Sequence, residues 1–143
     1  MFLLISDTLL GDGVETLIKY QDSGRIMDSR PVLGLIEQVI VIGTKGMQEK
    51  VIARIDTGAT SSSIDERLVE KLDLGPMLRL KLVKSASGSK RRPLICVKIK
   101  IDGKVMEEEF TVADRAHMTY QLLIGQNILK KERFLIDPLK KGV

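Results

Sequence analysis

From Val32 onward, hydrophobic and polar residues alternate along much of the chain, which is the pattern of half-buried β-strands. The runs Val39–Ile42 and Val51–Ile55 are separated by Gly43-Thr44-Lys45-Gly46, so they predict two strands joined as a hairpin. Asp102-Gly103 is a two-residue turn of the kind that joins paired strands. Further strands are predicted over 78–83, 94–101, 104–113, 122–125 and 134–136. The chain therefore carries about seven or eight predicted strands.

Two short segments break this pattern with helical signals. Ser63 and Glu66 have the spacing of a capping box, and Ile64, Leu68 and Leu72 fall on one helical face, so a helix is predicted to begin near Ser63. A second short helix is predicted over 126–131. Many strands with one or two short helices predict an all-β fold.

Residues 1–30 differ from the remainder because their periodicity is weak and they are rich in turn-forming residues. A chain of 143 residues corresponds to about one domain. We therefore predict a main domain over 31–143, preceded by an N-terminal extension or extra hairpin over 1–30. A loose arm fits the same residues.

Composition narrows the classes of function. The net charge is +4, but acidic and basic residues are interspersed and no aromatic stacking motif accompanies them, so nucleic acid is not the expected partner. A basic RNA-associated protein stays a third option, which salt-sensitive binding would support. The apolar run Met1–Ile5 is too short for a signal peptide or a membrane span, so we expect a cytoplasmic protein without membrane contact.

Metal chemistry is not expected either. The chain holds one Cys, Cys96, and one His, His117, whereas a zinc site needs three or four ligands. We therefore predict no metal and no cofactor. Cys96 lies between two apolar residues and is predicted to be a small buried side chain. His117 is interpreted as a surface or hydrogen-bonded residue rather than a catalytic base.

The main chemical candidate is a carboxylate at a strand end. The strand predicted over Val51–Ile55 runs directly into Asp56-Thr57-Gly58-Ala59. An ordinary turn, or a loop kept for structure alone, is the alternative interpretation of these four residues. Ser61-Ser62-Ser63 is interpreted as turn and helix cap rather than as a nucleophile.

Two motifs together resemble the retropepsin-like aspartic peptidases. The loop Asp56-Thr57-Gly58-Ala59 is similar to the catalytic loop of that family, and 122–129 is similar to the retroviral-protease segment in which two apolar residues and a Gly lead into a short helix. The resemblance implies an acid-protease (retropepsin-like) closed β-barrel. It also implies that the residues at the neighbouring strand end and helix start lie beside the catalytic loop, namely Ile124, Gly125, Gln126 and Asn127.

A third segment points to a subfamily. Ala53–Ala59, 114–118 and 123–125 together are similar to retropepsin-like proteins known as ATP-dependent zinc proteases, which are often linked to RimK-type amino-acid ligases. The resemblance covers roughly residues 34–138. It implies that Arg115 braces the active-site loop, and a merely solvated side chain is the alternative. The zinc of that label finds no ligand set in this sequence.

In this family two carboxylates share one proton, and they act on a water molecule and on the scissile carbonyl. The chain contains one such loop, so we predict a homodimer in which each protomer supplies Asp56. Thr57, Gly58 and Ala59 would support the loop, with the Thr57 hydroxyl bonding across the dimer axis. Retroviral enzymes carry an acidic residue and an Arg where this chain has Thr60 and Gln126, so that ion pair is missing.

The segment Ser85-Ala86-Ser87-Gly88-Ser89 is the candidate flap, a mobile cover made of small residues. Between Arg79 and Lys100 the charged residues are all basic, which suggests acidic peptide substrates, with a solvated basic face as the alternative. The predicted function is hydrolysis of peptide or related amide bonds. The alternative is a non-catalytic dimeric module of the same fold that binds peptides by β-strand addition.

Overall fold

The computed structural model describes residues 3–6, 17–20, 26–141 and 143. The chain divides into two compact units, Met1–Pro31 and Val32–Val143. In the first unit, three strands form an antiparallel sheet: β1 (Leu3–Ser6), β2 (Leu17–Tyr20) and β3 (Ile26–Asp28). The extension predicted over 1–30 falls partly outside the described residues, so its role stays a prediction.

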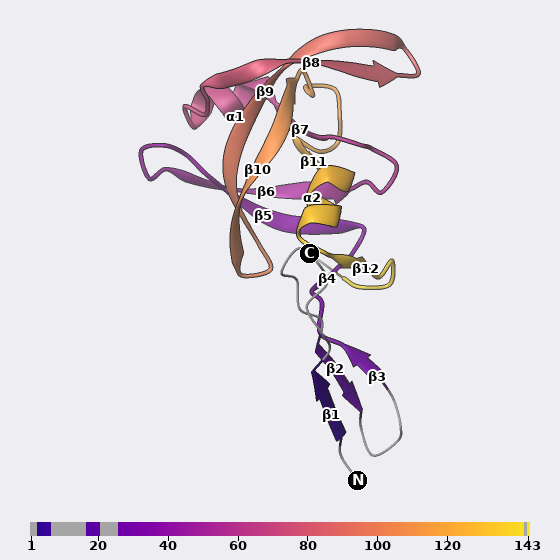
Figure 1. The fold of residues 1–143 in the computed structure, drawn as a ribbon. Helices are drawn as coiled ribbons and strands as arrows, with labels where there is room; N and C mark the ends of the chain where they lie inside the picture. The colour runs from indigo at the N-terminus through magenta and orange to yellow at the C-terminus, as the bar shows by residue number, and fades with distance from the viewer. Residues whose placement is uncertain (1–2, 7–16, 21–25, 142) are drawn as a thin grey trace. The chain divides into compact units, whose positions relative to one another are not determined.

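Six strands of the second unit close into a barrel, which Figure 1 shows in ribbon form. Around the barrel the order is β10-β7-β11-β6-β5-β9, and β9 pairs back with β10, while β8 extends the sheet beyond β9. The barrel strands are β5 (Ile36–Ile42), β6 (Gln48–Ile55), β7 (Ser62–Asp65), β9 (Gly88–Ile101), β10 (Lys104–Ala113) and β11 (Leu122–Ile124). The remaining elements are β4 (Val32–Leu33), α1 (Glu66–Lys71), β8 (Met77–Ser85), α2 (Gln126–Lys131) and β12 (Leu135–Ile136), of which β4 and β12 form a small parallel pair. This closed barrel with two short helices confirms the predicted all-β fold class.

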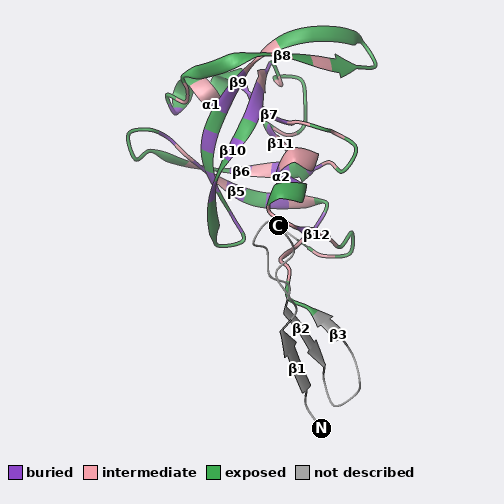
Figure 2. Ribbon diagram, viewed as in Figure 1, coloured by how far each residue is buried: buried purple, intermediate pink, exposed green. Residues whose placement is uncertain are grey.

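The barrel interior is filled by aliphatic side chains, as the strand alternation predicts. Along β5, Val39 and Val41 are fully buried, and along β9, Ile99 and Ile101 are fully buried, while the residues between them face outward. Figure 2 shows the buried residues concentrated on the barrel strands. Phe110 of β10 is the bulkiest fully buried side chain. Burial of each such side chain contributes about 1.5–3 kcal/mol. The core consists mainly of β-branched residues and Leu rather than of aromatic residues.

The first predicted helix is present as α1, but the prediction that it begins near Ser63 with a capping box is wrong. Ser62–Asp65 forms strand β7, and α1 begins at Glu66. The N-cap residue Asp65 makes no side-chain hydrogen bond to the helix. β7 pairs with β10 on one side and β11 on the other, and this pairing outweighs the local capping signal. The second predicted helix, over 126–131, coincides with α2.

The prediction that Cys96 is buried is also wrong, because its side chain is exposed. Its neighbours on β9, Ile95 and Val97, face the core, and strand alternation therefore turns Cys96 outward. Within the part of the chain that the structure describes, no three His, Cys, Asp or Glu side chains gather closely enough to hold a metal ion. No helix among the described residues is long and apolar enough to cross a membrane.

Candidate active site

Asp56 lies directly after β6, where its backbone is fixed by the neighbouring strand. β6 and β11 run parallel, and the Asp56 N–H donates to the Ile124 carbonyl at 2.9 Å. The Asp56 Oδ1 accepts a hydrogen bond from the Gly58 N–H at 3.0 Å, and the Ala59 N–H donates to the Asp56 carbonyl at 3.3 Å. The Asp56 side chain is half-buried, so a positioned carboxylate remains accessible from solvent.

The start of α2 fastens the other side of this loop. The Gln126 N–H donates to the Ala59 carbonyl at 2.7 Å, and its side-chain Nε2 donates to the Thr57 carbonyl, also at 2.7 Å. The Asn127 N–H donates to the Thr60 carbonyl at 3.3 Å. The structure thus brings the helix start and the Asp56 loop together, and Gln126 bonds the loop backbone in place of an ion pair.

A buried serine connects three elements behind the loop. The Ser62 hydroxyl donates to Asn127 Oδ1 at 2.7 Å and accepts from the Gly125 N–H at 2.9 Å. Asn127 Oδ1 also accepts from the Ser62 N–H at 2.9 Å, while Asn127 Nδ2 donates to the Glu109 carbonyl of β10 at 2.9 Å. Sequence interpretation missed Ser62, which it assigned to a turn. The only sequence signal was its place in a short polar run before a buried Ile.

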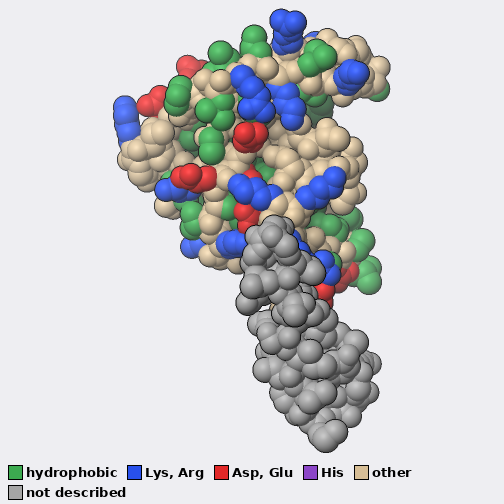
Figure 3. Space-filling view, viewed as in Figure 1, with side chains coloured by type: hydrophobic (Ala, Val, Ile, Leu, Met, Phe, Trp, Pro, Cys, Tyr) green, Lys and Arg blue, Asp and Glu red, His purple; other side chains and the backbone are tan. Residues whose placement is uncertain are grey.

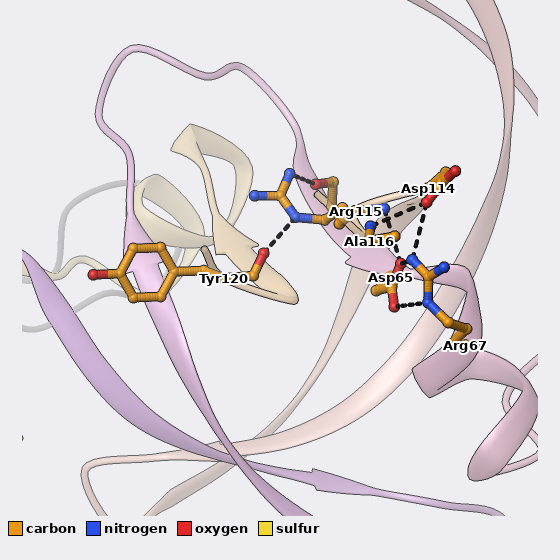
Figure 4. Close-up of polar contacts among 7 residues, drawn as sticks. Asp65, Arg67, Asp114, Arg115, Ala116 and Tyr120 are labelled. Carbon is orange, nitrogen blue, oxygen red and sulfur yellow. Dashed lines mark hydrogen bonds and ion pairs between the residues drawn. The ribbon is translucent and has the colours of Figure 1, made fainter. Parts of the chain in front are cut away.

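Arg115 lies between β7 and the segment before β11 (Figure 4). Its Nε donates to the Tyr120 carbonyl at 2.8 Å, its Nη1 donates to Ser63 Oγ at 2.9 Å, and its backbone N–H donates to Asp65 Oδ1 at 2.8 Å. The Asp65 carboxylate is held at both oxygens by the Arg67 side chain. Arg115 therefore ties β7 to the segment before β11, and its hydrogen bonds within the described residues do not reach the Asp56 loop.

Two charged groups here have shifted pKa values. Burial acts to raise the pKa of Asp65, but the hydrogen bonds from Arg67 and from the Arg115 N–H outweigh it and leave the pKa below its usual value. Burial lowers the pKa of the Arg115 guanidinium, and nearby Arg92 lowers it further, while Asp65 and Asp56 oppose the change. Arg115 is thus a half-buried cation within electrostatic reach of Asp56.

The candidate flap forms the tip of the β8–β9 hairpin. Ser85 pairs with Gly88 across the tip, and Gly88 has a φ of +119°, a conformation that favours glycine. The Ser85 Oγ lies 3.0 Å from the Ser87 Oγ and donates to the Gly88 carbonyl at 3.2 Å. Residues 85–89 are all exposed. Their function as a flap stays a prediction.

Two carboxyl groups, the buried Glu108 and the partly exposed Glu132, interact near the C-terminal end of α2. Glu108 of β10 is only 3% exposed, and its Oε2 lies 3.3 Å from the Lys131 Nζ. Burial and, secondarily, the hydrogen bond with Glu132 raise the pKa of Glu108 to about 7, against the opposing charge of Lys131. The same hydrogen bond lowers the pKa of Glu132, whose carboxylate also pairs with Lys104 at 2.6 Å. Glu108 therefore holds its proton in the folded protein up to near-neutral pH.

We expect the stability of the protein to fall as pH rises through 7. The folded pKa of Glu108 lies above its ordinary value of 4.5, so its contribution is fully present below pH 4.5 and is lost as pH rises through about 7. Glu132 has a lowered pKa and changes stability only below this window. The expected loss between pH 5.5 and pH 8 is roughly 1–3 kcal/mol, measurable by thermal unfolding at both values. Glu108→Gln should flatten this dependence; an equal slope in the variant would contradict the assignment.

Known structures of similar fold were found for this chain. A structure of similar fold is that of the protein Lpg0085, of unknown function, from Legionella pneumophila subsp. pneumophila str. Philadelphia 1, with a TM-score of 0.55 and 18% identity over 79% of this chain and 97% of that chain. Another is the EIAV protease complexed with the inhibitor HBY-793, with a TM-score of 0.54 and 20% identity over 72% of this chain and 88% of that chain. At these identities the likeness shows the fold alone. A comparison with curated protein sequences found no match.

A match to a family model shows the family of this chain. The RimB-like model, described as retropepsin-like aspartic endopeptidase RimB, matches residues 66–143. The match includes β11 and α2, and it begins after the Asp56 loop. Since it covers more than half of the chain, this protein belongs to the RimB-like family of retropepsin-like aspartic endopeptidases.

Proposed function

We propose that this chain is one protomer of a homodimeric aspartic peptidase that hydrolyses peptide or related amide bonds, with one Asp56 from each protomer. The observation that carries the proposal is the Asp56 carboxylate, accessible from solvent at the end of β6 in a loop fastened by β11 and by the start of α2. The chain has one Asp-Thr-Gly loop, so it supplies one carboxylate of the pair that this chemistry needs. Membership of the RimB-like family supports the same reaction class.

The reaction divides between the two copies of Asp56. In the proposed dimer the two Asp56 carboxyl groups would lie too close together for both to be ionised, so one is a carboxylate and the other keeps a proton. The carboxylate takes a proton from water as the water oxygen bonds to the scissile carbonyl carbon, while the protonated partner gives its proton to the carbonyl oxygen. The tetrahedral intermediate then collapses: the C–N bond breaks, the leaving nitrogen takes the proton held by the first carboxyl group, and a hydroxyl of the intermediate returns its proton to the second carboxylate as the new C=O bond forms.

The neighbouring residues have supporting roles in this proposal. Gly58 presents its N–H to the carboxylate, and the absence of a side chain leaves room for substrate. The Thr57 hydroxyl would bond across the two-fold axis, and Ala59 supplies the carbonyl that Gln126 holds. The tip over 85–89 would close over bound substrate as a flap.

The proposed substrate is an acidic peptide or protein segment. Figure 3 shows Lys and Arg side chains over the β8–β9 hairpin, and the sequence between Arg79 and Lys100 contains no Asp or Glu. Within that stretch Arg79 lies 3.9 Å from Glu109, a long and exposed ion pair. A field of one sign over a cleft concentrates oppositely charged substrate. The resemblance to the zinc-protease subfamily linked with RimK-type ligases stays a prediction. Because RimK-type ligases add glutamates, that resemblance agrees with an acidic substrate.

The alternative function is a non-catalytic dimeric module that binds peptides. β8 stands at the end of the sheet order, so one of its edges has no neighbouring strand among the described residues. Such an edge can accept an extended peptide by strand addition without cleavage. Binding of a peptide that is never hydrolysed would favour this module over the peptidase.

The oligomeric state directly tests whether one chain supplies only one of the two catalytic carboxylates. Light scattering at micromolar concentration should give about twice the 15.9 kDa chain mass. Adding an equal amount of Asp56→Asn protein to a fixed amount of unsubstituted protein should lower its activity to about half after exchange, because random pairing leaves half as many intact pairs. An unrelated protein at the same concentration is the control. Activity that survives unchanged in a strictly monomeric sample would sink the proposal.

A further inference from the structure

Four side chains share one face of the strands that carry the site. Arg54 of β6 lies opposite Leu123 of β11, and Leu123 lies opposite Ser63 of β7. Residues opposite one another on neighbouring strands point to the same face, and Asp56 continues the alternation two residues after Arg54. The Ser63 position is two strands, or about 10 Å, from that of Arg54, and the two residues from Arg54 to Asp56 bring its separation from Asp56 to about 12 Å. An extended peptide advances about 3.3 Å per residue, so a side chain one or two residues from the scissile bond can bring its carboxylate toward Ser63.

Arg115 is fixed on this face. Its hydrogen bond to Ser63 Oγ places the guanidinium over β7, and its bond to the Tyr120 carbonyl holds the other edge. Tyr120 also lines a cavity of about 530 Å³ together with Arg54 and Ile55, the residues that directly precede Asp56. The guanidinium is thus bonded to one residue of the cavity lining and lies within electrostatic reach of Asp56.

Arg115 lacks the counter-charge that a half-buried cation normally has. Both of its side-chain hydrogen bonds go to neutral oxygens, and it forms no ion pair with any residue that the structure describes. The Asp65 carboxylate, which could neutralise it, is taken at both oxygens by Arg67. The repulsion from Arg92 adds to the cost. A partly desolvated charge without a partner is unfavourable, and a carboxylate from outside the chain would satisfy it.

We propose that Arg115 determines specificity at this site by binding the carboxylate of an acidic substrate side chain close to the scissile bond. The inference rests on the proposed peptidase function and assigns the acidic preference to the half-buried guanidinium of Arg115 rather than to the exposed lysines of the hairpin. The planar guanidinium suits a carboxylate because its N–H groups form parallel hydrogen bonds in a fixed geometry. The bonds to Ser63 and Tyr120 keep it oriented before substrate arrives.

The test compares two peptide pools that are identical except for Glu or Gln at the central position. Binding is measured by fluorescence anisotropy with Asp56→Asn protein, and cleavage of quenched forms is measured with Asp56 intact. We expect the Glu pool to bind about tenfold more tightly or better, as close charge pairs at partly buried positions do. Arg115→Gln should remove this preference, and Arg115→Lys should keep part of it because the charge stays and the fork is lost.

Lys84→Gln is the matched control, because it removes an exposed cation of the β8–β9 hairpin and leaves Asp65 paired with Arg67. It should leave the ratio between the two pools unchanged. Equal weakening of both pools by Arg115→Gln would reduce Arg115 to a structural brace and overturn the inference, as would a Glu preference that survives in that variant. If binding shows the preference but neither pool is cleaved by the unsubstituted protein, the specificity assignment stands and the peptidase proposal fails.

Discussion

Asp56→Asn is expected to abolish peptide hydrolysis, with a loss of roughly 10⁴-fold or more. The amide has the size of the carboxylate and its oxygen can still accept the hydrogen bond that the Gly58 N–H donates at 3.0 Å. It cannot accept a proton from water, so the general base disappears while the loop keeps its shape. Cleavage of a quenched fluorescent peptide measures the loss, and thermal unfolding should show a nearly unchanged melting temperature.

Asp102→Asn is the matched control for this substitution. Asp102 also precedes a glycine, but it lies in the β9–β10 turn with a φ of 50°, a conformation that Asn adopts readily. The variant should retain full activity. If Asp56→Asn retained near-normal turnover in the same assay, Asp56 would not be the catalytic group, and the peptide-binding module would become the better description.

The strands were largely predictable because one face of each is buried. Ile99 and Ile101 alternate with the exposed Lys98 and Lys100, and a period of two is the direct consequence of a sheet with one face on the core. The run Val39–Ile42 was recognised instead by its β-branched residues. The closure of the barrel was not predictable from this pattern. It depends on β9, which is 14 residues long and pairs with β5, β8 and β10 at different points along its length.

The local signals failed where pairing between distant strands outweighed them. Ser63 and Glu66 have a capping-box spacing, yet Ser63 lies in β7 because β10 and β11 provide partners on both sides. The same misassignment hid Ser62, whose hydroxyl connects Gly125 and Asn127. Cys96 shows the converse case, since an apolar neighbourhood in sequence says nothing about which face of the strand a residue takes.

The sequence predicted the segments that make up the candidate site, but not the hydrogen bonds that connect them. A strand that ends in Asp-Thr-Gly, and a Gly at the start of a short helix, could be recognised and were expected to meet. The function of Gln126 as a donor to the Thr57 carbonyl needed coordinates, because one residue precedes the other by 69 positions. Within the described part of the chain, the Arg115 guanidinium has no carboxylate partner because Arg67 binds both oxygens of Asp65, and this competition between two arginines cannot be deduced from their spacing in the sequence.

Gly125→Ala is expected to destabilise the protein by roughly 3 kcal/mol and to lower its melting temperature by about 10 °C. A Cβ at this position would lie 2.6 Å from the Ser61 carbonyl oxygen and 2.8 Å from the Ala59 carbonyl oxygen. Both contacts are with backbone, so no side-chain rotation relieves them. The Gly125 N–H also donates to Ser62, so a shift of the helix start would break that bond as well. Thermal or denaturant unfolding measures the change.

Gly58→Ala is the matched control because it adds the same methyl group to the same loop region. There the nearest heavy atom to a new Cβ is the Asp56 Oδ1 at 3.4 Å, an ordinary contact. Its stability should change by less than about 1 kcal/mol, whatever happens to catalysis. Equal stability losses in the two variants would show that the loop tolerates no side chain anywhere. A loss confined to Gly125→Ala would identify the close backbone contact between the start of α2 and residues 59–61 as the feature that holds Asp56 in place.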